Sequence, residues 1–142
     1  MKTSGLTIRR ASFDEWRSIV KFIDTHLHNM YHDPGFLPSG MIRDKIGRQQ
    51  VIVAESDVGI LGIAVTNGET LWNLVVHKEH RNKGIGSKIL KSIDPKFVRI
   101  KCSGGFPNPT DFYEKNGYHK VEFVSSSITK EKTILLAERA SN

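Results

Sequence analysis

The chain has one cysteine among its 142 residues, Cys102, and therefore cannot form an internal disulfide. It also lacks any run of about 18 apolar residues, the minimum for a membrane-spanning helix. Its first residues contain no apolar core of the kind found in secretion signals. The single cysteine excludes a disulfide framework and fits a reducing compartment. We therefore expect a cytoplasmic protein with no membrane segment.

Length and charge indicate the number of domains and the class of ligand. The chain fits one domain, which we expect to span residues 1–142, and its net charge is +6. Several basic residues gather in one short segment, opposed by a single carboxylate: Lys78, Arg81, Lys83, Lys88 and Lys91, with Glu79. Such a local cluster suits a polyphosphate ligand better than the long row of phosphates on a nucleic acid. We therefore favour a small anionic ligand and keep nucleic acid as the alternative.

Hydrophobic periodicity predicts the first elements. Residues 6–10 alternate apolar and polar and predict a strand. Ser12 and Glu15 have the spacing of a capping box, and the apolar residues that follow recur at helical spacing to about His28. Two prolines and a glycine then indicate a loop, and a short helix is predicted around 41–47.

Three strands are predicted in the middle of the chain. They cover residues 50–55, 58–65 and 70–76. The pair Asn67-Gly68 accepts positive φ, which is the requirement of a two-residue hairpin turn. We therefore expect the last two of these strands to be antiparallel.

The second half of the chain alternates helices and strands. A helix from Ile85 to Ile93 should stop at Asp94-Pro95, because proline cannot continue it. Later segments are read in the same way: a strand at 97–102, a short helix between Asn108-Pro109 and Asn116-Gly117, and closing strands at 118–124 and 132–137. The order β-α-α-β-β-β-α-β-α-β-β predicts an α/β or α+β fold, a mixed sheet with helices on its faces.

A glycine-rich turn carries the clearest chemical signal. Strand, glycine-rich turn and helix is a common phosphate-binding arrangement, because glycines let backbone N–H groups approach an anion. The turn here is Arg81-Asn82-Lys83-Gly84-Ile85-Gly86-Ser87. It lacks the Gly-Lys-Ser/Thr ending of a P-loop, and Ile89 occupies the place of the third glycine in a dinucleotide fingerprint.

Two motifs together point to one family. The first runs from Leu74 and Val76 to Arg81-x-x-Gly84-x-Gly86, and the second is Phe112-Tyr113-Glu114-Lys115-Asn116-Gly117-Tyr118. In this order they resemble the acetyl-CoA core of the GNAT superfamily of N-acetyltransferases. The resemblance implies the GNAT-type acyl-CoA N-acyltransferase fold, with a mixed six- to seven-stranded sheet flanked by about four helices. It also implies acetyl-CoA as cosubstrate.

The resemblance implies a site as well. The strand before the turn should splay from the next strand, and the pantetheine arm of CoA should pair with the main chain of Leu74, Val75 and Val76. Backbone N–H groups should hold the diphosphate at Arg81, Asn82, Lys83, Gly84, Ile85, Gly86 and Ser87. Asn108 should face CoA, although Asn-Pro is also an ordinary helix start. Tyr113 is the candidate acid that protonates the leaving thiolate, with a half-buried structural tyrosine as the alternative.

The expected reaction is direct attack of a primary amine on the thioester in a ternary complex. The acceptor class stays open among small metabolites, a peptide N-terminus, lysine and aminoglycosides. No general base is assigned, although His28, His32 and Asp33 are candidates because the loop that holds them borders the acceptor in this fold. His26, His28, His32 and Asp33 also have a spacing like that of metal ligands, but we disfavour a metal site there because the segment runs into a loop with proline and glycine. Rival functions are a tRNA-directed acetyltransferase and a non-catalytic acyl-CoA-binding module, and the chain is expected to be a monomer or a homodimer.

Overall fold

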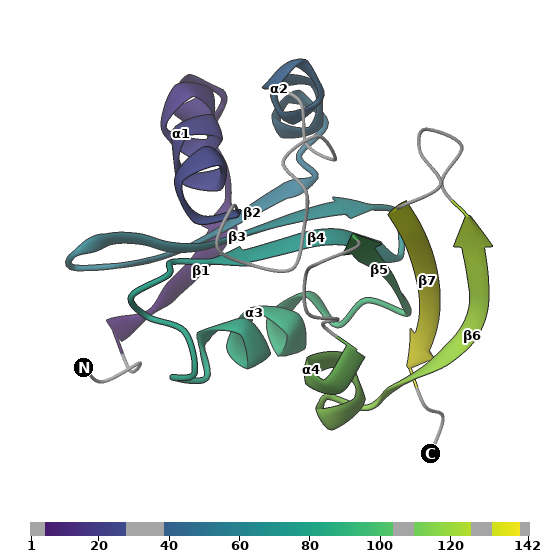
Figure 1. Cartoon of the computed structure of the whole chain (residues 1–142). Coiled ribbons are helices and arrows are strands. Elements are labelled where there is room, and N and C mark those ends of the chain that lie inside the picture. The colour runs from purple at the N-terminus through teal and green to yellow at the C-terminus, as the bar shows by residue number, and fades with distance from the viewer. Residues whose placement is uncertain (1–4, 28–38, 104–109, 126–131, 140–142) are drawn as a thin grey trace.

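The computed structural model describes residues 5–27, 39–103, 110–125 and 132–139, and one seven-stranded sheet runs through them (Figure 1). Its spatial order is β1-β2-β3-β4-β5-β7-β6, and every neighbouring pair is antiparallel except β4 and β5. The strands are β1 (Thr7–Arg10), β2 (Val51–Ser56), β3 (Gly59–Asn67), β4 (Thr70–Val76), β5 (Phe97–Ser103), β6 (Tyr118–Ser125) and β7 (Lys132–Arg139). The mixed sheet expected from the sequence is confirmed.

Helices cover both faces of the sheet. The structure has a short 3-10 helix, η2 (Phe13–Glu15), and the α-helices α1 (Trp16–Leu27), α2 (Ser39–Gly47), α3 (Ile85–Ile93) and α4 (Thr110–Lys115). Helices α1 and α2 lie on one face, and α3 and α4 lie on the other (Figure 1). The predicted element order is therefore confirmed.

Each face has its own hydrophobic core. Ile19 and Ile23 of α1 pack with Val75 of β4 on the α1/α2 face. On the opposite face, Ile85 and Ile89 of α3 pack with residues that include Leu74 and Val76 of β4. Strand β4 therefore serves both cores, because its successive side chains alternate between the two faces.

The hairpin between β3 and β4 differs in detail from the prediction. Asn67 still belongs to β3 and pairs with Thr70, so the turn residues are Gly68 and Glu69. Of the predicted pair, only Gly68 has a positive φ, at 61°. The prediction of an antiparallel hairpin is confirmed, but the turn begins one residue later than expected because Asn67 continues the ladder.

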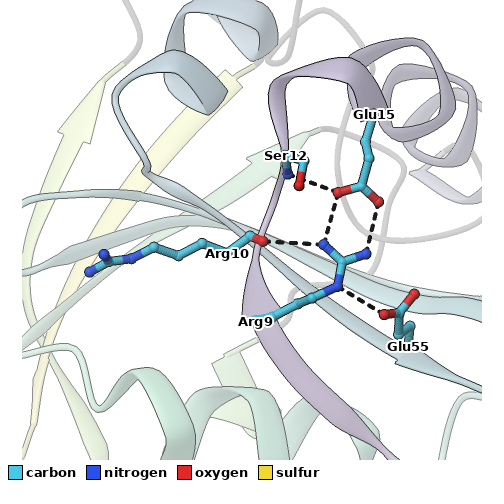
Figure 2. A network of polar contacts seen from close by, with 5 residues as sticks. All are labelled: Arg9, Arg10, Ser12, Glu15 and Glu55. Carbon is cyan, nitrogen blue, oxygen red and sulfur yellow. Dashed lines mark hydrogen bonds and ion pairs between the residues drawn. The ribbon is translucent and has the colours of Figure 1, made fainter.

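A charged network joins the first strand to the first helical turn (Figure 2). Nη1 and Nη2 of Arg9 donate to the two carboxylate oxygens of Glu15, each at 2.8 Å, and Nε donates to Glu55 at 2.8 Å. Glu15 also accepts from the backbone N–H of Ser12 at 2.8 Å, as its place in the predicted capping box requires. Arg9 lowers the pKa of Glu15, because its hydrogen bonds favour the ionised carboxylate.

We expect Glu15→Gln to lower the free energy of unfolding by about 1–2 kcal/mol at neutral pH, because it weakens a bidentate pair and the cap together. Urea unfolding at low and high salt measures the loss. Asp44→Asn is the matched control, since Asp44 pairs with Arg48 at 2.9 Å in an exposed i,i+4 position. Exposed pairs of this kind contribute under about 0.5 kcal/mol, so equal losses for the two variants would contradict the structural role of Glu15.

Candidate active site

Strands β4 and β5 separate soon after they meet. Their parallel ladder has two registered pairs, Thr70 with Phe97 and Leu71 with Val98, at the start of each strand. Beyond this point β5 continues alongside β7 and β4 continues alongside β3. The expected splay is therefore present, and it opens beside the second half of β4.

Main-chain groups of β4 face this opening. The N–H of His77 donates to Leu61 at 2.9 Å, so His77 and every second residue before it exchange hydrogen bonds with β3. Val75 therefore pairs with β3. Leu74 and Val76 direct their N–H and C=O groups to the other side, toward β5. Of the three residues expected to pair with pantetheine, Leu74 and Val76 are the two whose backbone faces the gap.

The turn after β4 places a helix terminus at the mouth of the opening. Asn82 and Gly84 adopt left-handed conformations, with φ of 64° and 82°. Gly84 is the N-cap of α3, and Lys88 is the first residue of that helix whose N–H donates back, to Gly84 at 3.1 Å. The N–H groups of Ile85, Gly86 and Ser87 thus have no acceptor within the helix, and this positive end favours an anion.

The side chain of Arg81 serves the backbone. Its Nε donates to the carbonyl oxygen of Val76 at 3.1 Å, and its Nη2 donates to that of His26 at 2.6 Å. The guanidinium therefore ties the turn to the ends of β4 and α1. Because these donors are directed to main-chain carbonyls, the Arg81 side chain is not arranged to contact a phosphate directly.

Gly86 is where the two sequence motifs meet. A Cβ at this position would lie 3.1 Å from Cζ of Phe112 and 3.6 Å from a methyl group of Val76. Helix α3 can approach β4 and α4 this closely only because residue 86 has no side chain. The second glycine of the first motif is therefore required for packing against the phenylalanine of the second motif.

Tyr113 lies in the same core cluster. It is 4% exposed, and its ring stacks edge-on with those of Phe112 and Tyr118, at centroid distances of 5.0 and 6.4 Å. Burial raises the pKa of Tyr113, and Tyr118 adds to the shift. Within the described residues its hydroxyl makes no hydrogen bond, whereas that of Tyr118 donates to the carbonyl of Pro95. The Tyr118 hydroxyl thus has a structural partner, whereas Tyr113 is buried in the core cluster and its hydroxyl has no hydrogen-bond partner among the described residues.

Three histidines stack at the end of β4, and sequence analysis missed their association. The ring centroids of His26 and His77 lie 4.1 Å apart, and those of His77 and His80 lie 4.9 Å apart. His26 is 5% exposed, and its Nδ1 accepts from the N–H of Lys78 at 3.0 Å. Burial, and to a smaller extent the nearby His77, Arg81 and Lys78, lower the pKa of His26 to about 4. His26 belongs to α1, whereas His77 and His80 belong to the turn after β4. Spacing along the sequence therefore does not reveal that His26 joins the other two.

Some predicted site residues lie outside the described residues. They are Asn108, His28, His32 and Asp33. In the part of the chain that is described, no three His, Cys, Asp or Glu side chains are arranged to hold a metal ion. Nor does that part contain a helix of the length and apolarity needed to cross a membrane.

Comparisons with known proteins bear on the family and the fold. The sequence profile described as "Acetyltransferase (GNAT) domain" matches residues 47–120, just over half of the chain. No curated protein matches the sequence at a significant level. A GNAT-family acetyltransferase from Bacillus cereus has a similar structure, with a TM-score of 0.71, 14% identity and coverage of 96% of this chain and 99% of that one.

Two further solved structures are similar. A polyamine N-acetyltransferase from Drosophila melanogaster has a TM-score of 0.66, 10% identity and coverage of 93% of this chain and 98% of that one. The PaiA N-acetyltransferase from Thermoplasma acidophilum, in complex with coenzyme A, has a TM-score of 0.61, 16% identity and coverage of 95% and 99%. At such low identities the structural likeness establishes the fold alone.

The contact between Gly86 and Phe112 is testable by a double-mutant cycle. We expect Gly86→Ala to destabilise the protein by about 1 kcal/mol, because the new Cβ must displace the ring. Phe112→Leu removes Cζ and costs stability on its own by loss of packing. The double variant should lose about 1 kcal/mol less stability than the sum of the losses in the two single variants. Strict additivity in denaturant unfolding would show that the two motifs do not depend on this contact.

The buried histidine gives an expected pH dependence. Unfolded His26 titrates near its ordinary pKa of about 6.5, so between about pH 6.5 and 4 the unfolded chain binds more protons than the folded one. The free energy of unfolding therefore has its full value above about pH 6.5 and decreases as the pH falls from there toward 4. His26→Asn keeps an acceptor near Nδ1 and cannot titrate, so it should lose about 1–2 kcal/mol less between about pH 7.5 and 5 than the natural protein loses.

The control is His119→Asn, because His119 is exposed on β6. Urea unfolding at the two pH values should give this variant the same loss of stability as the natural protein. If His26→Asn also loses as much as the natural protein, burial of His26 does not cause the acid sensitivity.

Proposed function

The chain belongs to the GNAT acetyltransferase family, and from this premise we propose that it transfers acetyl from acetyl-CoA to a primary amine by direct attack in a ternary complex. The observation that carries the proposal is the splay of β4 from β5, next to a helix terminus with free first-turn amides. Together these features match a ligand that has amide groups along an arm and a diphosphate at one end. Acetyl-CoA is such a ligand, and a solved structure of similar fold contains coenzyme A.

The main chain supplies most of the binding. The backbone of Leu74 and Val76 faces the gap and can pair with the amides of pantetheine as a strand pairs with an added strand. The amides of Ile85, Gly86 and Ser87 lie where the diphosphate would reach the positive end of α3. The backbone N–H at Leu74 or Val76 is also suited to donate to the thioester oxygen as negative charge develops on it.

Tyr113 suits the departing sulfur. Its raised pKa keeps the hydroxyl protonated over the whole working pH range, so it is a hydrogen-bond donor whenever substrate binds. In the reaction a C–N bond forms as the C–S bond breaks. The sulfur then receives a proton delivered through the Tyr113 hydroxyl, and the nitrogen releases one proton to solvent. A general base from the protein is not required by this scheme.

The proposal also covers the class of amine acceptor and the cellular compartment. Structures of similar fold include a polyamine N-acetyltransferase and a ribosomal-protein-alanine N-acetyltransferase, so both small amines and peptide N-termini are acceptor classes to test. We place the protein in the cytoplasm, because its single cysteine suits a reducing compartment. The rival RNA-directed function is tested by adding tRNA to the same acceptor panel.

The test is thiol release from acetyl-CoA with a panel of amines, peptides and tRNA, alongside calorimetry of CoA binding. We expect CoA binding without an acceptor and thiol release only with one. Tyr113→Phe should lower kcat by about a hundredfold or more, the usual effect of losing a general acid. Its affinity for CoA and its thermal stability should stay nearly constant, since the ring stacking is retained.

Tyr118→Phe is the matched control in the same aromatic cluster. It loses the hydrogen bond to Pro95, so it should lower the thermal stability while kcat stays close to the natural value. Absence of CoA binding would overturn the proposed function altogether. CoA binding with no thiol release for any acceptor would favour the non-catalytic alternative, and equal kcat for Tyr113→Phe would remove the acid role.

A further inference from the structure

Two cations lie over one indole ring at the point where the sheet opens. Trp72 and Arg99 are the residues that directly follow the last registered pair of β4 and β5. Cζ of Arg99 lies 4.5 Å from the centroid of the Trp72 ring, and Nζ of Lys45 from α2 lies 3.9 Å from it. Trp72 packs against the core on the α1/α2 face, so both cations are on that face.

The two cations differ in their partners. Lys45 is 6% exposed, and its three donors reach oxygens of Gln50, Thr66 and Asn67 at 3.0, 3.3 and 3.3 Å. All three oxygens are uncharged, so Lys45 is satisfied in hydrogen bonds but is not neutralised. Its nearest acidic neighbour on α2 is Asp44, which pairs with Arg48 at 2.9 Å.

Arg99 has no such partners within the described residues, where the structure gives it the Trp72 stack and neither a hydrogen bond nor an ion pair. It is half-buried, and burial lowers the pKa of its guanidinium. The ring covers the flat face of a guanidinium but leaves its N–H donors unmatched. A half-buried cation of this kind is costly unless an anion completes it. Among the side chains that the structure describes, no carboxylate pairs with Arg99.

We infer that Arg99 binds a carboxylate carried by the amine acceptor, an inference that rests on the proposed function. The faces of the sheet give the direction. Helix α3, whose terminus would hold the diphosphate, covers one face, and α1 and α2 cover the other (Figure 1). Trp72 packs against the core on the α1/α2 face. An acceptor that reaches the gap from the α1/α2 face passes Arg99. One uncommitted cation balances the single charge of a carboxylate, and the planar fork can bind both of its oxygens.

The strand also sets a length. Trp72 and Leu74 are two residues apart, which is roughly 7 Å along a strand. The acceptor carboxylate should therefore lie several bonds from the reacting nitrogen, as in a straight-chain amino acid with about four carbons between the two groups. Polyamines should be poor acceptors, because Lys45 and Arg99 would repel their additional positive charges.

The first test compares matched acceptors in the thiol-release assay. 5-Aminopentanoate should exceed 5-aminopentanamide in kcat/KM by about tenfold or more, as loss of a charged hydrogen bond predicts. Arg99→Gln should abolish this preference by reducing kcat/KM for the carboxylate alone, and Arg99→Lys should restore part of it. CoA binding by calorimetry should be unchanged in both variants, which separates an acceptor defect from a failure to fold or to bind cosubstrate.

Arg43→Gln is the control, because Arg43 stacks on the other tryptophan, Trp16, at 4.6 Å. It should keep the full preference for the carboxylate. Equal rates with the two acceptors in the natural protein, or a preference that survives Arg99→Gln, would overturn the inference.

A second test does not require catalysis. In a Trp16→Phe background, Trp72 is the only tryptophan, so its fluorescence reports on the ring beneath Arg99. Glutarate should change this emission in a saturable way, and the uncharged glutaramide should not. The response should disappear in Arg99→Gln. If glutarate gives no response, the anion site is absent even if acetyl transfer is found; if it gives one in a protein that binds no CoA, the anion site stands and the proposed function fails.

Discussion

The parting of β4 from β5 is the constraint on which the remaining structure depends. Two registered pairs hold the strands together, and beyond them β4 presents the backbone of Leu74 and Val76 to no described strand. Exposed strand edges are ordinarily covered or blocked in proteins, because they attract other chains. This edge is flanked by α3 and α4, and Arg81 donates to the carbonyl of Val76 at its end. The arrangement thus favours a slender ligand with amide groups over another strand.

The packing around the gap makes the two glycines of the turn unequal. Gly84 is needed for its positive φ at the start of α3, whereas Gly86 is needed because Phe112 lies against it. Helix α3 is thereby set close to β4, with its first-turn amides at the opening. The second motif therefore fixes the position of the helix that the first motif begins, and in the proposed function this is how it would support cosubstrate binding. This contact explains why the two motifs are informative together.

Local signals allowed most of the fold to be predicted, and contacts between distant segments set the limit. Helix α3 was predicted to its last residue, because Asp94 and Pro95 terminate it by rules that act within one turn. The insertion of β7 between β5 and β6 was not predicted, because the sequence of a strand does not determine which strands it pairs with. The stacking of His26 on His77 was missed for the same reason. These residues are 51 positions apart, and only the packing of α1 beside the end of β4 brings them together.

The difference between local signals and long-range contacts also explains why the sequence predicts a cosubstrate but not an acceptor. The proposed binding along β4 and at α3 would use main-chain groups, whose positions follow from glycines, caps and a strand pattern in the sequence. The acceptor site proposed at Trp72 consists of side chains from α2, β4 and β5, which come together only in the folded sheet. The acceptor preference proposed above therefore rests on Lys45, Trp72 and Arg99, which no local sequence pattern brings together.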